Sequence, residues 1–178
     1  MESIEFIQLC EEKFKYLKHD FGFNIIEKNA ESINPYIIFG KNNLHIKINY
    51  QFFAVPEFPI VVYLIKKEKK LFGKFFSKDI NYEFDDLLIY KKCHTNVYDY
   101  LEYNNIESFY NKMTEENLAF YKEKYSKNEE VSMLLNKYAH LLKDFGHEIL
   151  NEDFTILKEI RKMRDSYDKK YNCNSFPL

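Results

Sequence analysis

Nine consecutive residues, from Leu44 to Phe52, alternate between apolar and polar side chains without interruption. Successive side chains of a β-strand point to opposite faces, so this pattern predicts a strand with one dry face and one wet face. The dry set is Leu44, Ile46, Ile48, Tyr50 and Phe52. A sheet that is wet on one side is typically antiparallel and carries helices on its other side. The segment therefore predicts an α+β fold and not a doubly wound nucleotide-binding fold.

Three further runs of strand-forming residues surround this segment. Turn signals separate them, because Asn34-Pro35 precedes the second run and residues 40–43 form a hairpin between it and the alternating segment. Before the first run, Gly22 stands where only glycine adopts, without steric cost, the left-handed conformation that ends a helix. The predicted strands are residues 23–27, 36–39, 44–52 and 60–65. Together they predict an antiparallel meander of about four strands.

Helical spacing of apolar residues marks the rest of the chain. An amphipathic helix is predicted over residues 2–18, and a long helix is predicted over residues 129–150, where the pattern is strongest. Asp153 is the expected N-cap of a last helix that reaches Tyr171. Shorter helices are predicted around residues 84–88, 106–113 and 118–125. This order places a C-terminal group of helices on one face of the sheet.

The length and composition are those of one domain. A chain of 178 residues with 46% hydrophobic residues can enclose a single core, so we expect one domain over residues 1–178. Within it, residues 1–82 are expected to form a helix and the sheet, residues 83–171 the helical part, and residues 172–178 a loose tail. No glycine-serine or proline-rich linker divides the chain.

The charge balance limits the classes of partner. The chain has 26 lysine and arginine residues against 28 aspartate and glutamate residues, a formal net charge of -2. This balance gives no global attraction to nucleic acid, so such a contact would need a local patch. The chain has no apolar stretch long enough for a membrane span, no secretory signal pattern, and three widely spaced cysteines that form no disulfide framework. We expect a cytoplasmic protein with reduced thiols and no membrane contact, and leave its oligomeric state open.

One set of residues has the spacing of metal ligands. His140, Asp144 and His147 recur at i, i+4 and i+7, which places them on one side of a predicted helix. This stripe lies opposite the apolar stripe of the same helix, so it should face solvent. A metal site on an open helix face lacks the supporting groups that fix its ligands. We therefore assign no metal ligand.

Other polar pairs have simpler structural interpretations than catalysis. Cys93 and His94 are adjacent, and adjacent side chains point in different directions, whereas a nucleophile and its base must be in contact. Asp85-Asp86 and Glu115-Glu116 stand at predicted helix starts, where acidic residues complement the helix dipole. We assign no catalytic residue and no cofactor.

The most distinctive segment outside the predicted core runs from Lys66 to Lys78 and holds six lysines and three phenylalanines. Basic residues between aromatic ones can follow phosphates and stack on bases, or can present apolar anchors to a protein. In a simpler arrangement the lysines stay in water while the apolar residues fold back over the sheet edge. The absence of arginine argues against base-specific recognition. The partner-binding candidates in this segment are Lys70, Phe72, Lys74, Phe75 and Phe76.

The layout of the chain resembles that of a group of small bacterial proteins. Its elements are the turn at residues 21–23, the meander that contains residues 44–52, and the helix end at residues 142–150, followed by residues 151–154. In this order they resemble small bacterial cytoplasmic proteins of uncharacterised families, some of which look like immunity partners of secreted toxins. The resemblance covers most of the chain in layout, transfers no catalytic residue, and implies a binding role.

The leading hypothesis is a non-enzymatic intracellular protein-binding domain of the immunity type, whose partner is another protein such as a toxin. The polar side chains of the alternating strand join the lysine and phenylalanine segment as the candidate contact surface; they are His45, Lys47, Asn49 and Gln51. One alternative is a single-stranded nucleic-acid-binding protein that uses the lysine and phenylalanine segment. Another is a small metal-assisted hydrolase that uses the polar stripe at residues 140–147.

Overall fold

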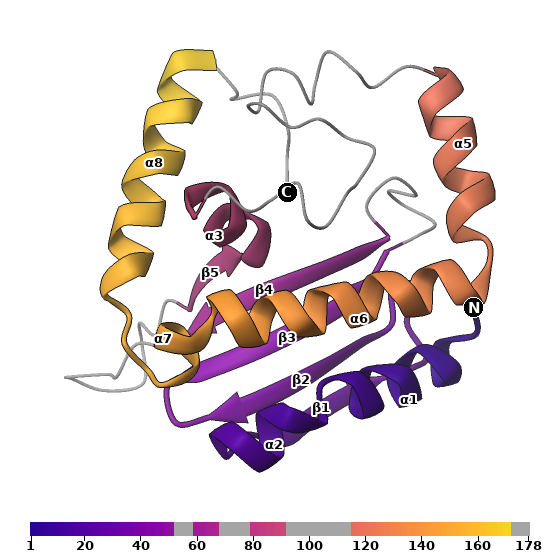
Figure 1. Cartoon of the computed structure of the whole chain (residues 1–178), viewed down its shortest axis with the longest axis horizontal. Helices are drawn as coiled ribbons and strands as arrows, with labels where there is room; N and C mark the ends of the chain where they lie inside the picture. Colours follow the sequence, from indigo (N-terminus) through magenta and orange to yellow (C-terminus); the bar gives the residue numbers. More distant parts are fainter. Residues whose placement is uncertain (52–58, 68–78, 92–114, 172–178) are drawn as a thin grey trace.

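The computed structural model describes residues 1–51, 59–67, 79–91 and 115–171, with the backbone alone at 115–118 and 167–171. It contains a five-stranded antiparallel sheet in the order β1-β2-β3-β4-β5, so each strand pairs with its neighbours in the sequence (Figure 1). The strands are β1 (Asn24–Asn29), β2 (Tyr36–Lys41), β3 (Leu44–Tyr50), β4 (Ile60–Lys66) and β5 (Ile80–Glu83). Helices precede and follow this meander. The predicted α+β class is confirmed.

The strand β3 shows the predicted alternation between a dry and a wet face. Its even-numbered residues from Leu44 to Tyr50 are at most 2% exposed, whereas the residues between them are half-buried. The register places Ile46 between Phe39 of β2 and Leu64 of β4. Cross-strand neighbours of this kind form one continuous apolar layer. Phe52, the last residue of the predicted strand, lies outside the described residues.

The sheet has five strands where the sequence predicts about four. The additional strand, β5, has only four residues, of which Tyr82 alone is buried. So short a segment does not show a recognisable two-residue period. It pairs with β4 and forms one edge of the sheet, while β1 forms the other edge.

The helices α1 (Ser3–Lys13), α2 (Lys15–Phe21) and α6 (Asn128–Phe145) lie over the dry face of the sheet (Figure 1). Their buried side chains share one core with those of the strands. The prediction of a single helix over residues 2–18 is wrong, because the chain leaves the helical conformation at Phe14. The Phe14 ring is fully buried with its centroid 6.4 Å from that of Phe39. This interruption lets α2 bring Leu17 into the core as well.

The long helix predicted over residues 129–150 is also divided. The helix α6 ends at Phe145, and a short helix, α7 (His147–Leu150), follows Gly146. A Cβ atom on Gly146 would lie 2.5 Å from the carbonyl oxygen of Leu142, which real Cβ atoms do not approach so closely. A glycine therefore permits the change of direction at this point. The predicted apolar stripe between Val131 and Ile149 lies in or against the core.

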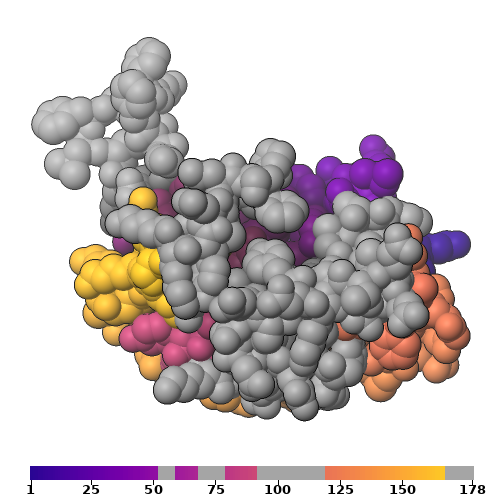
Figure 2. Space-filling view, turned by 90° about the horizontal axis from the view of Figure 1, so that it is seen from above, coloured from indigo at the N-terminus to yellow at the C-terminus, as the bar shows by residue number. Residues whose placement is uncertain are grey.

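The remaining described helices are α3 (Phe84–Tyr90), α5 (Glu115–Tyr125) and α8 (Thr155–Tyr171). The helices α5 and α8 lie at opposite ends of the molecule (Figures 1 and 2), and α3 packs against α8 and β4. The Thr155 N–H donates to the Asp153 side chain at 3.0 Å, as expected for the start of the last helix. Gly22 ends α2 with a φ of 75°, also as predicted. The predicted helix at 106–113 and tail at 172–178 lie outside the described residues.

Two further properties of the described residues concern the helices and the cysteines. None of the described helices has both the length and the apolar character needed to cross a lipid bilayer. Cys10 is a free thiol in α1, and burial raises its pKa well above the usual value, so it stays protonated at neutral pH. Cys93 and Cys173 lie outside the described residues.

Candidate functional site

The wet face of the sheet carries the polar residues selected from the sequence. His45, Lys47 and Asn49 point away from the core and are half-buried, as is Gln51 just beyond β3. The strand register extends this surface over all five strands. We call it the outer face, and its side chains are those of Asn24, Glu27, Asn29, Tyr36, Ile38, His45, Lys47, Asn49, Val61, Tyr63, Ile65, Asn81 and Glu83. None of these side chains belongs to the described core cluster.

One row of residues shows the chemical character of the outer face. Glu27, Ile38, Lys47, Tyr63 and Glu83 are neighbours in successive strands from β1 to β5. A lysine stands at the centre, an aliphatic and an aromatic side chain flank it, and a carboxylate ends the row on each side. Protein interfaces combine apolar area with separated charges in this way.

Local contacts hold the side chains of the outer face in place. The Lys47 ammonium lies 4.0 Å from the centroid of the Tyr36 ring, a cation–π geometry. The Tyr36 hydroxyl donates to the Glu27 carboxylate, and this hydrogen bond raises the pKa of Tyr36. Burial and the nearby Lys67 charge lower the pKa of His45, so its imidazole is neutral at pH 7. At that pH the charges on the outer face come from its lysine and glutamates.

The lysine and phenylalanine segment begins at the end of β4. The candidates Lys70, Phe72, Lys74, Phe75 and Phe76 lie outside the described residues. At the start of the segment, the Lys67 ammonium is 2.5 Å from Asp79, and the Lys67 N–H donates to the Asn43 carbonyl at 2.7 Å. The Lys66 ammonium lies 5.0 Å from the Phe154 ring centroid. The described lysines at its start therefore contact the protein itself.

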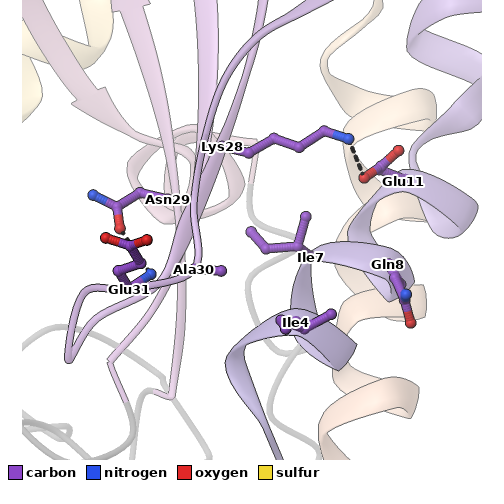
Figure 3. Close-up of a pocket in the computed structure, with 8 residues that line it drawn as sticks. All are labelled: Ile4, Ile7, Gln8, Glu11, Lys28, Asn29, Ala30 and Glu31. Atoms are coloured by element: carbon purple, nitrogen blue, oxygen red, sulfur yellow. Dashed lines mark hydrogen bonds and ion pairs between the residues drawn. The ribbon is translucent and has the colours of Figure 1, made fainter.

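A groove that was not expected from the sequence opens between α1 and the end of β1 (Figure 3). Its volume is about 620 Å³. One wall is the side of α1 that carries Ile4, Ile7, Gln8 and Glu11, and the other consists of residues 28–31. The ammonium of the lysine at position 28 lies 2.6 Å from the Glu11 carboxylate and so links the two walls.

A polar cluster lies where α3, α6 and α8 meet. The hydroxyl of the fully buried Tyr138 lies 3.1 Å from both carboxylate oxygens of Asp85 and donates to them. The Arg164 guanidinium of α8 is 2.7 Å from the buried Asp86. Burial raises the pKa of Asp85 to about 7, although the Tyr138 hydrogen bond opposes this shift. These contacts connect three helices, so we interpret the cluster as a structural junction.

The candidate metal ligands lie on two different helices. His140 and Asp144 belong to α6, whereas His147 begins α7 beyond the glycine that separates the two. All three are exposed, which confirms that they face solvent. Within the described ranges, no group of three histidine, cysteine or acidic side chains could hold a metal ion. Cys93 and His94 lie outside those ranges.

Comparisons with known proteins assign this chain to no family. No family model matches the chain, and neither a curated protein nor a solved structure matches it. The class that the fold defines is α+β, with a five-stranded meander covered on one face by helices.

Three local signals point to the features that were missed. Ile25 and Ile26 are adjacent, so the first strand lacks strict alternation, which is typical of an edge strand with little burial. Ile4 flanks the predicted apolar stripe of the first helix, yet it is 64% exposed because it borders the groove. Tyr138 stands in an otherwise apolar stripe, and a buried tyrosine hydroxyl normally has a partner. That partner, Asp85, is too distant in sequence to be recognised by spacing.

Proposed function

We propose that this protein is a non-enzymatic partner of another protein inside the cell, and that the outer face contacts this partner. The proposal rests on one observation: all five strands contribute aliphatic, aromatic and charged side chains to a surface outside the core cluster. The presence of the half-buried Ile38 and Ile65 among charged residues favours recognition.

An immunity-type role is the particular case that we propose. It follows from the layout resemblance and needs a tight, specific contact with one protein. The central row of the outer face supplies a distinctive charge order for such a contact, with Lys47 between Glu27 and Glu83. Charge order of this kind selects a partner more than it adds affinity.

Quantitative affinity capture from the native host tests this proposal. The tagged wild-type protein is compared with Lys47→Glu, which reverses the central charge of the outer face, and with Lys158→Glu, the same change at an exposed position of α8. We expect wild type and Lys158→Glu to retain one stoichiometric protein that Lys47→Glu loses. Thermal unfolding of each variant shows that the fold is retained.

Two results would contradict the proposal. Equal capture by Lys47→Glu and wild type would mean that the outer face does not make the contact. Loss of capture after nuclease treatment of the lysate would favour the nucleic-acid alternative, because that interaction depends on phosphates.

A further inference from the structure

The strand β1 has an edge that is open to pairing. It pairs with β2 on one side only, and within the described ranges no backbone hydrogen bond reaches its other side. Five of its six residues are exposed, including Ile25 at 38% and Ile26 at 50%. An unpaired edge presents a row of N–H and C=O groups that can bond to an added strand.

The open edge has a regular part and an irregular part. A register shift between Ile25 and Glu27 marks a bulge, which discourages pairing at that point. From Glu27 to Asn29 the pairing with β2 is regular. This regular part leads into the groove between α1 and residues 28–31 (Figure 3). An added strand therefore has matching backbone geometry where the groove begins.

The helical wall of the groove suits an extended chain with an aliphatic side chain. Ile4, Ile7 and Glu11 lie on one side of α1 over a length of about 10 Å, which matches about three residues of a β-strand. Ile7 is 6% exposed whereas Ile4 is 64% exposed. An aliphatic side chain placed over Ile4 would remove this apolar surface from water.

The charges around the groove suit a basic partner. Lys28 is already paired with Glu11, whereas Glu31 is exposed and forms no ion pair with another described residue. A lysine or arginine of the incoming strand would restore the balance.

We propose that the groove between α1 and β1 binds an extended segment of another protein as an added strand on β1. The segment carries alternating aliphatic and basic side chains, with an aliphatic one over Ile4 and a basic one beside Glu31. This site is separate from the proposed contact on the outer face and does not depend on it. The two surfaces adjoin along β1.

A second copy of this chain fits the groove less well. If two β1 strands paired, each would bring Glu27 and Glu31 to the shared edge, while the lysine at position 28 is engaged by Glu11. The bulge near Ile26 of each copy would also interrupt the pairing. The self-paired arrangement therefore combines acidic repulsion with irregular geometry.

The test uses a synthetic probe in place of the unidentified partner. The probe is the fluorescent peptide Thr-Lys-Val-Lys-Val-Lys-Thr with blocked ends, and binding is measured by fluorescence anisotropy. We expect saturable binding to wild type, about tenfold weaker binding to Ile4→Asp, and about fivefold weaker binding to Glu31→Lys. Ile33→Asp and Glu129→Lys make the same changes at exposed positions that do not line the groove and should bind normally.

Further readouts separate strand addition from surface attraction. A probe with N-methylated valines lacks backbone donors and should bind about tenfold more weakly, while a probe with glutamate in place of lysine should prefer Glu31→Lys. Hydrogen exchange should show new protection at residues 24–31 when the lysine probe is bound.

Several outcomes would overturn the inference. One is the absence of saturable binding up to about 1 mM probe, and another is an equal loss of probe affinity in Ile4→Asp and Ile33→Asp. A third is hydrogen-exchange protection that appears only outside β1. The last is a stable dimer of the protein that the probe does not dissociate. Lys47→Glu should bind the probe like wild type. Failure of the probe together with partner loss in Lys47→Glu would thus reject the groove and leave the outer face standing.

Discussion

The two faces of the sheet share the same strands and the same backbone hydrogen bonds, yet their side chains differ in burial. Ile37 and Ile38 are adjacent residues of the same type in β2, and their side chains lie on opposite faces of the sheet. Ile37 is fully buried in the core under the helices, whereas Ile38 is half-buried on the outer face beside Lys47. Buried apolar area stabilises a fold, while partly exposed apolar area among charges is available for recognition. We infer that the core face carries most of the stability and the outer face most of the specificity.

The matched pair of isoleucines gives the largest expected effect. Ile37→Ala should lower the free energy of unfolding by about 4 kcal/mol, because it removes buried methyl groups and leaves a cavity. Ile38→Ala should lower it by about 1 kcal/mol, because its side chain keeps contact with water. Urea unfolding followed by circular dichroism measures both values.

The comparison of faces fails if these two variants are alike. A loss above about 3 kcal/mol in Ile38→Ala would mean that the outer face is packed like a core. A loss of unfolding free energy below about 1 kcal/mol in Ile37→Ala would mean that the helices do not pack closely against the dry face.

One ionisable group, the Asp85 carboxyl of α3, lies among the helices and contacts the buried Tyr138. The Asp85 carboxyl has a pKa of about 7 in the folded protein, compared with 3.8 when unshifted, and burial is the main cause. The folded state therefore holds a proton that the unfolded state has released between these two values. Stability should fall by up to about 4 kcal/mol as the pH rises from about 4 to about 7, and change no further above that.

Asp85→Asn tests this exception. Asparagine keeps an oxygen that can accept from the Tyr138 hydroxyl, but it cannot ionise. We expect the variant to be about 4 kcal/mol more stable than wild type at pH 8, with little gain at pH 4. The control is Asp86→Asn, which weakens the contact with Arg164 and should lower stability at pH 8. If the difference in unfolding free energy between Asp85→Asn and wild type is the same at pH 4 and pH 8, Asp85 is not the group whose titration changes stability.

The sequence predicts which face of the sheet a side chain lies on better than it predicts which strand forms the edge or which residues far apart in the chain are in contact. A two-residue period is a property of one strand, so the burial of Ile46 and the orientation of Lys47 could be read directly. Which strand forms an edge depends on the whole meander, so the exposure of Ile26 could not be read in the same way. Asp85 lies in the first turn of α3 as predicted, but its burial against Tyr138 arises from a contact with a helix far along the chain.

Lys47→Met gives the smallest effect and the sharpest distinction between stability and recognition. Methionine keeps the apolar part of the side chain but loses the charge that lies over the Tyr36 ring. The free energy of unfolding should fall by less than about 1 kcal/mol, because a partly exposed cation–π contact contributes little. Partner capture should nevertheless be lost, as for Lys47→Glu. If capture persists in Lys47→Met and is lost only in Lys47→Glu, the introduced carboxylate repels the partner, and the native lysine charge does not contribute to recognition.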